Sequence, residues 1–206
     1  MASWYERRIL PHIIRLGCGC EAIAEYRELI VPQAKGRVLE LGFGAGANLD
    51  YYDPAAVSQV VGIEPSPELR AIAGKAPRAE GLNVDLCAGV GEHLAFDDAS
   101  FDSIVCTYTL CTVDDPGRTL AEARRMLRPG GLFLFSEHGA APDQNVARWQ
   151  KRLDPLWQRL FGGCHLTRHV RANIERHFVI DAHEARYQPG VPKLAGWMEW
   201  GRAIAR

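Results

Sequence analysis

Short apolar runs recur along the chain from residue 36 onward, and longer stretches of mixed polar and apolar residues separate them. Such runs are typical of buried strands, and their alternation with helical periodicity predicts a parallel sheet. We therefore expect strands at residues 37–41, 59–63, 82–87, 101–107 and 132–137. Helices are expected between them at residues 46–52, 67–75 and 117–127.

The helix at residues 117–127 has the clearest limits. Pro116 suits its first turn, and Leu120, Ala123, Arg124 and Leu127 recur at the spacing of one packing face. The run Arg128-Pro129-Gly130-Gly131 follows directly. We expect this run to end the helix and to turn the chain into the next strand.

The last third of the chain changes character. Residues 143–176 are predicted to be mostly helical, with an interruption at Gly162-Gly163. Two β-like runs follow at residues 178–187 and 194–205, joined by a turn that contains Pro189-Gly190. A terminal strand pair after a parallel set predicts a seven-stranded mixed sheet with one reversed strand in its last hairpin.

The fold class that these elements predict is α/β, a Rossmann-like sheet in a three-layer α/β/α arrangement. We expect a single domain over residues 1–206, because the chain has no internal repeat and no evident linker. Its parts are a helical cap, a cofactor-binding core, a helical substrate insert and a terminal β-hairpin. Their expected limits are residues 1–35, 36–140, 141–176 and 177–206.

The first residues, MASWYERRILPHIIRLG, have the spacing of an amphipathic helix. Trp4, Ile9, Ile13 and Leu16 give this stretch a partly apolar face, and it lacks the long apolar core of a secretory signal. No segment approaches the roughly 20 apolar residues that a membrane span needs. The sequence therefore predicts helical elements of a lid at the N-terminus.

Charge and cysteine content narrow the class of protein. The chain has 24 basic and 25 acidic residues, so its net charge of -1 argues against a nucleic-acid partner. Cys87, Cys106 and Cys111 lie in or beside apolar runs, as small buried side chains do, and a reducing cytoplasmic setting is expected. The run Cys18-Gly19-Cys20 near His12 does not have the spacing of common zinc sites, so we predict no metal.

The run VLELGFGAGAN at residues 38–48 is the clearest ligand-binding motif. As G-x-G-x-x-A it fits the dinucleotide fingerprint of NAD and FAD enzymes. As E-x-G-x-G-x-G, with Glu40 in front, it also resembles the loop that holds S-adenosylmethionine in class I methyltransferases. Glu40 favours the second interpretation, because an acid before the loop suits the ammonium of the cofactor's amino acid tail.

Glu64, at the end of the second predicted strand, suits ribose binding with either ligand, and its alternative is a capping role in the turn Glu64-Pro65-Ser66-Pro67. The length of the chain does distinguish a dinucleotide-binding dehydrogenase from a methyltransferase. A dehydrogenase normally needs a second region that places its substrate, and 206 residues leave little room for one.

Several longer runs carry a more specific resemblance. FDSIV at residues 101–105 and LRPGG at residues 127–131 resemble the framework of class I S-adenosylmethionine-dependent methyltransferases. Within that superfamily, the chain is similar to the methyltransferase-like thiol S-methyltransferases and their bacterial relatives, over roughly Gly36 to Arg168. The runs that carry this similarity are GFGAGANL, CTYTLCTVDDPGRTL, SEHGAA and LDPLWQRLFGGCHLTR. Animal members of that branch have an N-terminal membrane-anchoring segment, where this chain has a short amphipathic stretch.

The resemblance implies S-adenosylmethionine as the cofactor, bound over the first two strands. Many members contact adenine with an Asp after the third strand, and here Gly91 and Glu92 occupy that region. The cofactor-binding residues that it implies are Glu40, Gly42, Gly44, Gly46, Asn48, Glu64, Pro65, Gly91, Glu92, Thr107 and Leu110.

The acceptor is expected over the fourth and fifth strands. His138 is the first candidate for a base that takes a proton from a thiol acceptor, and a structural histidine is the alternative. Glu137 and Tyr108 lie at the same two strand ends and are further catalytic candidates, Glu137 as a residue that either orients His138 or only faces the core. Asp154 lies in the predicted helical insert, where it is a candidate to help the base and where a turn or cap role is favoured.

For other side chains of this region, a structural role is the alternative to a role in catalysis or binding. Cys111 and Cys164 are expected to serve packing, since direct methyl transfer needs no covalent nucleophile. An apolar stripe in the insert suits a substrate pocket, a helix core or weak peripheral membrane contact. Its members are Trp149, Trp157, Leu160 and Phe161.

The function implied by the resemblance is methyl transfer from S-adenosylmethionine to a small-molecule thiol, by direct in-line displacement. Hydrogen sulfide, methanethiol and small alkyl or aryl thiols are the expected acceptors. The alternatives are an N- or O-methyltransferase for a quinone, lipid or secondary metabolite, an NAD-binding oxidoreductase, and a protein that binds the cofactor without catalysis.

Overall fold

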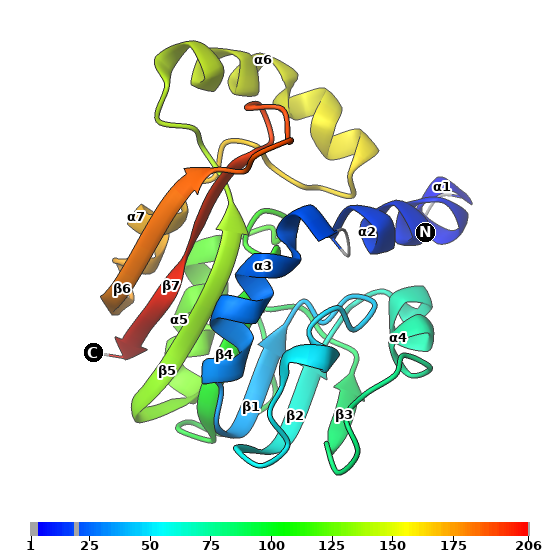
Figure 1. Cartoon of the computed structure of the whole chain (residues 1–206), viewed down its shortest axis with the longest axis vertical. Helices are drawn as coiled ribbons and strands as arrows, with labels where there is room; N and C mark the ends of the chain where they lie inside the picture. The colour runs from blue at the N-terminus through cyan, green and yellow to red at the C-terminus, as the bar shows by residue number, and fades with distance from the viewer. Residues whose placement is uncertain (1–3, 19–20, 206) are drawn as a thin grey trace.

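The computed structural model describes residues 4–18 and 21–205. A seven-stranded sheet forms its centre, in the order β3-β2-β1-β4-β5-β7-β6 (Figure 1). Neighbouring strands are parallel except that β7 runs antiparallel to both β5 and β6. The strands are β1 Gly36–Leu41, β2 Val57–Ile63, β3 Val84–Cys87, β4 Phe101–Thr107, β5 Leu127–His138, β6 Phe178–Tyr187 and β7 Trp197–Ala205. The predicted mixed sheet with one reversed strand is therefore confirmed.

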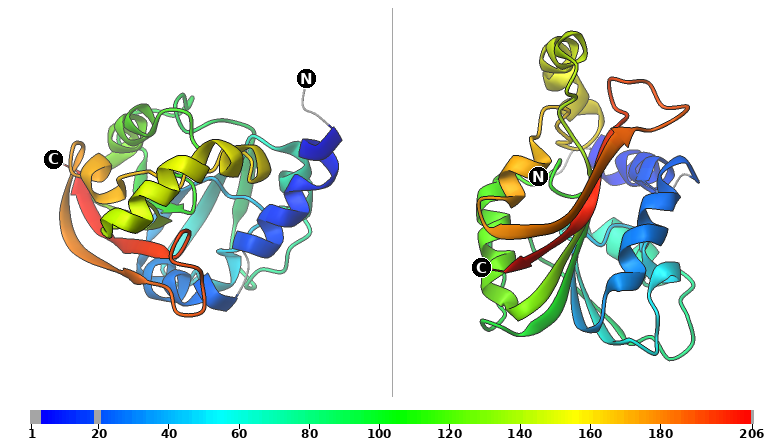
Figure 2. Two further views of the ribbon diagram at one scale, coloured as in Figure 1. Left: turned by 90° about the horizontal axis from the view of Figure 1, so that it is seen from above. Right: turned by 60° about the vertical axis from the view of Figure 1, so that its left-hand side comes forward.

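Helices cover both faces of the sheet and give the predicted three layers. Helix α3 packs on one face against β5 and β7, and α5 and α7 pack on the other (Figure 2, right). The α-helices are α1 Trp4–Arg8, α2 Leu10–Cys18, α3 Glu21–Ile30, α4 Pro67–Ala73, α5 Pro116–Met126, α6 Gln144–Leu160 and α7 Val170–Ile174. Two 3-10 helices, η1 Val31–Gln33 and η2 Leu49–Tyr51, complete the regular elements of the described chain.

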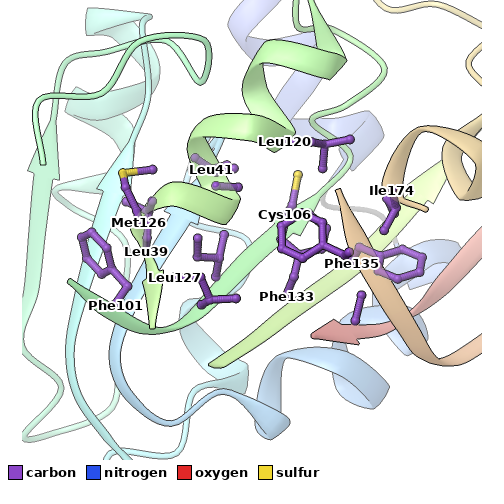
Figure 3. Close-up of a cluster of buried hydrophobic side chains, with 14 of the residues drawn as sticks. Leu39, Leu41, Phe101, Cys106, Leu120, Met126, Leu127, Phe133, Phe135 and Ile174 are labelled. Carbon is purple, nitrogen blue, oxygen red and sulfur yellow. The ribbon is translucent and has the colours of Figure 1, made fainter. Parts of the chain in front are cut away.

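The hydrophobic core lies on both faces of the central strands, which alternate their side chains between two clusters. The cluster beneath α5 includes Leu39, Leu120 and Phe133 (Figure 3). Phe133 of β5 stacks on Phe178 of β6, with ring centroids 4.7 Å apart, so aromatic packing ties the terminal hairpin to the parallel part of the sheet.

The helix predicted at residues 46–52 is wrong, because turns and the single turn of η2 occupy this region. Gly44 and Gly46 have φ values of 57° and 87°. These left-handed conformations keep the chain in a loop before it can enter a helix.

Several predicted limits also shift. The strand predicted to begin at residue 132 begins at Leu127, so the run Arg128-Pro129-Gly130-Gly131 lies inside β5. The pairing of β4 with β5 shifts register between Phe101 and Ser103, which accommodates this run with Gly130 at φ 75°. The insert contains two helices, α6 and α7, and residues 161–169 between them form turns and extended chain.

Parallel strands bring their carboxyl ends to the upper edge of the sheet in Figure 1, beneath α6. Helices α1 and α2 lie beside the end of α6 at this edge (Figure 2, left). The Tyr5 hydroxyl donates a hydrogen bond to the Leu160 carbonyl, 2.6 Å away, and Leu10 packs against Gly162. The two predicted helical regions thus meet over the strand ends.

Candidate cofactor and acceptor site

The glycine loop after β1 has no room for larger side chains at its first position. Gly42 has φ 67°, and a Cβ there would overlap the side chain of Thr109, which follows β4. Phe43 packs its ring over Gly62 of β2 in the same way. The loop therefore lies directly against the two neighbouring strands, and Gly44 and Gly46 are half-buried there.

Glu64 at the end of β2 connects that strand to the glycine loop. One carboxylate oxygen accepts a hydrogen bond from Gly44 N and the other from Ser66 N, each at 2.9 Å. Burial raises the pKa of Glu64, and these two backbone donors oppose the rise. The carboxylate stands where a ribose is expected at a strand end, and its ribose role stays a prediction. Pro65, next along, accepts a hydrogen bond from Arg70 through its carbonyl oxygen.

Glu40 belongs to a buried polar cluster that joins β1, the glycine loop and β4. Its carboxylate accepts hydrogen bonds from Asn48 Nδ2, at 2.9 Å, and from the Tyr52 hydroxyl, at 2.6 Å. Asn48 Nδ2 also donates to Thr107 Oγ1, at 3.0 Å. Burial raises the pKa of Glu40 to about 7, so its charge depends on what binds beside it.

Arg27 of α3 is a candidate cofactor residue that the sequence analysis missed. Its side chain is 3% exposed, and its guanidinium carbon lies 4.7 Å from the centre of the Tyr108 ring. Nε is buried without a hydrogen-bond partner among the described residues, and no ion pair of Arg27 is found there. Its positive charge acts on Glu40 and on Tyr108. A buried guanidinium without a counterion favours an anionic ligand.

The two residues expected near adenine lie between β3 and α5. Glu92 accepts a hydrogen bond from Asp115 N, at 3.2 Å, and so ties its loop to the start of α5. Gly91 packs against Thr119, which leaves no room for a Cβ. The adenine contacts themselves stay predictions.

Glu137 of β5 holds the turn that follows β4. One of its oxygens accepts hydrogen bonds from Thr109 N, at 2.8 Å, and from Leu110 N, at 3.1 Å. Burial raises the pKa of Glu137 to about 7. Among the described residues no hydrogen bond joins Glu137 to the His138 ring, so no direct contact supports the expected role of Glu137 in orienting that ring. Glu137 instead positions Leu110 and the turn that contains it.

Tyr108 adopts a left-handed backbone conformation, with φ 55°, at the end of β4. Its hydroxyl donates to the Ile23 carbonyl oxygen of α3, at 3.3 Å, and burial raises its pKa. A bulky residue at positive φ is uncommon and marks strain that is often found at functional sites. The phenol is directed toward α3, and a catalytic role for Tyr108 stays a prediction.

His138, the predicted base, lies in a cluster with two cysteines. Its Nε2 is 3.1 Å from Cys164 Sγ, and the Trp157 indole N–H donates to the same sulfur at 3.4 Å. A hydrogen bond with Cys111, followed by the charge and hydrogen bond of His138, lowers the pKa of Cys164 to about 4 against the effect of burial. His138 Nδ1 is buried without a partner in the described structure.

Asp154 of α6 lies outside this cluster. Its carboxylate accepts hydrogen bonds from Leu166 N, at 2.6 Å, and Gln158 Nε2, at 2.7 Å, and lies 3.1 Å from His165 Nδ1. These contacts fasten the segment after α6 to the helix. The predicted help of Asp154 to the base has no direct contact with His138 in the described structure.

The apolar stripe of α6 divides between two sides of the helix. Trp157 and Phe161 stack with ring centroids 4.1 Å apart and are half-buried, whereas Trp149 and Leu160 are 56% and 46% exposed. The Trp157 indole N–H contacts Cys164 Sγ, and the expected membrane contact of the exposed side chains stays a prediction.

The edge of the sheet where the parallel strands end thus brings together most predicted site residues. We call the residues around Glu40 and Glu64 the cofactor group and those around His138 the acceptor group, after the ligands expected there. Cys20 lies outside the described residues, as does the side chain of Cys18, so the run Cys18-Gly19-Cys20 is not placed. Two surface hollows lie elsewhere, over β6 and beneath α5, and no predicted site residue lines them.

Comparison with known proteins shows which proteins the chain is similar to. A family described as a methyltransferase domain matches residues 39–135. A chain from the complex of the Haloferax volcanii Trm112 methyltransferase activator with its methyltransferase covers 96% of this chain, and this chain covers 97% of it. The TM-score is 0.69 at 17% identity, which supports the fold alone. Together with the glycine loop and the strand-end acids, the match to the methyltransferase domain makes the chain similar to the class I S-adenosylmethionine-dependent methyltransferases.

Within this class the chain is similar to thiol S-methyltransferases. It is 38% identical to TMT1A of Homo sapiens over 162 residues and 35% identical to TMT1B of Rattus norvegicus over 161 residues. These matches cover 76% of this chain and 65% of each relative, so the chain spans just under two thirds of their length. A demethylmenaquinone methyltransferase of Thermus thermophilus is 30% identical over 116 residues, which cover 56% of this chain and 53% of that relative.

None of the helices in residues 4–18 and 21–205 combines the length and the apolar character needed to cross a bilayer.

Proposed function

We propose that this protein transfers a methyl group from S-adenosylmethionine to a small-molecule thiol by direct in-line displacement. The observation that carries the proposal is the similarity to two thiol S-methyltransferases, at 38% and 35% identity over 76% of the chain. Hydrogen sulfide, methanethiol and small alkyl or aryl thiols are the acceptors we expect, in a reducing cytoplasmic setting.

The residues at the ends of β1 and β2 fit the cofactor. Gly42 lets the glycine loop pack closely against Thr109, and Glu64 stands beside the loop for the ribose hydroxyls. The buried Arg27 suits the carboxylate of the cofactor's amino acid tail, and the Glu40 carboxylate suits its ammonium. When bound there, S-adenosylmethionine supplies a methyl group on a sulfonium, which is already an activated leaving group.

The protein's own task is to hold an acceptor sulfur in line with the methyl group over β4 and β5. Proximity and orientation supply much of the rate of such a step. The acceptor must lose its proton, because a free thiol has a pKa of about 8.5 and the thiolate is the nucleophile. A cluster of three titratable side chains lies at this edge, formed by His138, Cys111 and Cys164, and the Trp157 indole N–H donates to the last of them.

An N- or O-methyltransferase acting on a quinone, lipid or secondary metabolite is the second candidate. The observation that favours it is the 32% identity to a phosphatidylethanolamine N-methyltransferase of Cereibacter sphaeroides. That match covers 57% of the chain, against 76% for the thiol enzymes. We therefore place the thiol first.

Product identification separates the two candidates. The purified chain is incubated with S-adenosylmethionine and an equimolar pool of thiols, phenols and amines, and the methylated products are identified by mass spectrometry. We expect thioethers as the main products. Methyl ethers or methylamines without thioethers would support the second candidate and refute the thiol proposal.

A further inference from the structure

Three potential metal-binding side chains converge at the acceptor end of the sheet. Cys111 Sγ, a ring nitrogen of His138 and Cys164 Sγ all lie within 4.8 Å of one another. The ligand atoms of a tetrahedral zinc site are about 3.6–3.8 Å apart, given Zn–S bonds of about 2.3 Å and Zn–N bonds of about 2.0–2.1 Å. Small side-chain movements therefore suffice to place all three around one ion.

The segments that carry these side chains are fastened to one another. Cys111 lies in the turn after β4, and its carbonyl oxygen accepts a hydrogen bond from His165 N, at 2.8 Å. Ala140, just after β5, donates through its N–H to the Arg168 carbonyl oxygen, at 2.8 Å. The segment that bears Cys164 is thus bonded to Cys111 itself and to Ala140, two residues after His138. The fold therefore builds this arrangement, and exposed, mobile side chains do not.

The donor set selects a soft divalent ion. Thiolate and imidazole ligands suit Zn²⁺, whereas Mg²⁺ and Ca²⁺ require oxygen ligands. The Trp157 indole N–H donates to Cys164 Sγ at 3.4 Å, which is the kind of outer contact that supports a metal-bound thiolate. We propose that Cys111, His138 and Cys164 bind a Zn²⁺ ion at the carboxyl ends of β4 and β5.

Charge and protons balance in this site. Each cysteine binds as a thiolate, so the protons of both thiols pass to solvent as the ion enters. Two thiolates and a neutral imidazole then cancel the charge of the ion, which suits a place where Cys111 is buried and the other two side chains are half-buried.

Three protein ligands leave one position of a tetrahedral ion open, as in catalytic zinc sites. Resting on the proposed function, we assign this position to the sulfur of the acceptor thiol, whose proton is released to solvent on binding. In methyl transfer the acceptor sulfur forms a bond to the methyl carbon. The bond from that carbon to the sulfonium breaks, and its electron pair stays on the sulfur of S-adenosylhomocysteine.

The proposal changes the role expected for His138. Its Nε2 faces Cys164 and is the ligand atom, so Nδ1 carries the ring proton. The ring then cannot also accept a proton from the acceptor. His138 becomes a ligand, and the ion takes over the task of stabilising the acceptor thiolate.

Metal content tests the site without reference to activity. The full chain is purified under reducing conditions and saturated with Zn²⁺, and bound metal is measured by elemental mass spectrometry after gel filtration. Replacement with Co²⁺ then reports thiolate ligation through its charge-transfer absorption. We expect about one ion per chain in the wild type, and loss of most of it in Cys111→Ser, Cys164→Ser and His138→Ala.

Two further variants keep the test sharp if a substitution harms folding. His138→Cys preserves a three-ligand set and is expected to retain the ion, whereas Cys87→Ser lies at the end of β3, outside the cluster, and should bind like the wild type. A folded wild type that binds neither Zn²⁺ nor Co²⁺ would overturn the proposal. Full binding in all three ligand variants would also overturn it, because the ion would then sit elsewhere.

Different outcomes would refute the proposed metal site and the proposed thiol methyltransferase function. Thiol methylation at an undiminished rate by a chain shown to be free of metal would remove the ion from the reaction and leave the proposed function intact. Metal binding that depends on the three ligands, without methylation of any thiol, would leave the site standing and refute the function. A change in the Co²⁺ spectrum on addition of a small alkyl thiol tests the fourth position, and an unchanged spectrum would remove the acceptor from it.

Discussion

At the end of β1, the Glu40 carboxylate is 1% exposed and is held by Asn48 and Tyr52. Burial raises its pKa to about 7, so near neutral pH the group is divided between its neutral and charged forms. Only the charged form pairs with the ammonium of the cofactor tail. The charge state of one side chain therefore couples cofactor affinity to pH.

Affinity for S-adenosylhomocysteine is expected to rise with pH. Below a folded-state pKa of about 7 the carboxyl is protonated, so the ligand loses affinity about tenfold from pH 8 to pH 6. Isothermal titration calorimetry at both pH values measures this change. Glu40→Gln should bind weakly at pH 8 and show no such pH dependence. An equal pH dependence in that variant would assign the titration to another group.

The buried Arg27 guanidinium predicts a contribution specific to the cofactor's carboxylate. Arg27→Met removes a charged donor worth about 1.5–3 kcal/mol, which corresponds to about a tenfold to hundredfold loss of affinity for S-adenosylhomocysteine. Arg27→Lys should retain part of it. Fluorescence or calorimetric titration of the purified variants provides the measurement.

A matched ligand separates this role from a packing role. 5′-Methylthioadenosine has the adenosine and sulfur but lacks the amino acid tail, so its affinity should be the same in the wild type and in Arg27→Met. Equal losses for both ligands would mean that Arg27 supports the structure of the pocket and does not bind the carboxylate.

Side-chain roles could be predicted where a motif is contiguous. Glu40 and Glu64 were found because each ends a strand beside the glycine loop, and their places at the loop are as expected. Arg27 carries no local signal, because only the packing of α3 over Tyr108 buries it. Cys111 and Cys164 were expected to serve packing, because direct methyl transfer needs no covalent nucleophile. Their proximity could not be predicted, since residues 53 positions apart along the chain meet only through the turns after β4 and α6.

At the scale of elements, the glycine loop shows what periodicity misses. Residues 46–52 were predicted as helix, but positive φ values at Gly44 and Gly46 keep the chain in turns. The strands were easier to predict, because continuous apolar runs are buried on both faces of a parallel sheet. The run at residues 128–131 was expected as a turn, and it lies within β5 because a register shift against β4 absorbs it.

Substitutions of two glycines with positive φ, Gly130 and Gly42, distinguish the effect of backbone strain from the effect of a changed cofactor loop. Gly130 has open space at its Cβ position, so Gly130→Ala should lose about 1–2 kcal/mol of unfolding free energy from strain alone and keep its ligand affinity. Gly42→Ala adds overlap with Thr109, so we expect a larger loss of stability and at least about tenfold weaker binding of S-adenosylhomocysteine. Urea unfolding and titration measure both. Unchanged binding in Gly42→Ala would contradict the placement of the cofactor on this loop.

Asp154 holds the segment of residues 161–169 after α6 in place, because its carboxylate accepts a hydrogen bond from the Leu166 backbone N–H. Asp154→Ala leaves this buried donor unpaired and should lower the free energy of unfolding by about 1–3 kcal/mol, measured in urea. Asp154→Asn keeps an oxygen for Leu166 N, and we expect a smaller loss. Unchanged stability together with a large loss of turnover would instead favour the catalytic role predicted from the sequence.

Across the whole molecule, the strand order of the sheet separates the proposed cofactor site from the proposed acceptor site along one edge. The ends of β1 and β2 carry the cofactor group, and the ends of β4 and β5 carry the Cys111, His138 and Cys164 cluster. Helices α2 and α6 meet above this edge, where Leu10 packs on Gly162. The alternation of elements along the chain was sufficient to predict this architecture, whereas the identity of the acceptor depends on the similarity to thiol S-methyltransferases.

The central claim is methyl transfer to sulfur. The most direct measurement compares initial rates with three acceptors of one skeleton, benzenethiol, phenol and aniline, each with S-adenosylmethionine and the purified chain. Methylated product and S-adenosylhomocysteine are quantified together by mass spectrometry. We predict thioether and S-adenosylhomocysteine in equal amounts with benzenethiol, and little product from the other two. Methylation of phenol or aniline at a rate equal to or above that of the thiol would contradict the account.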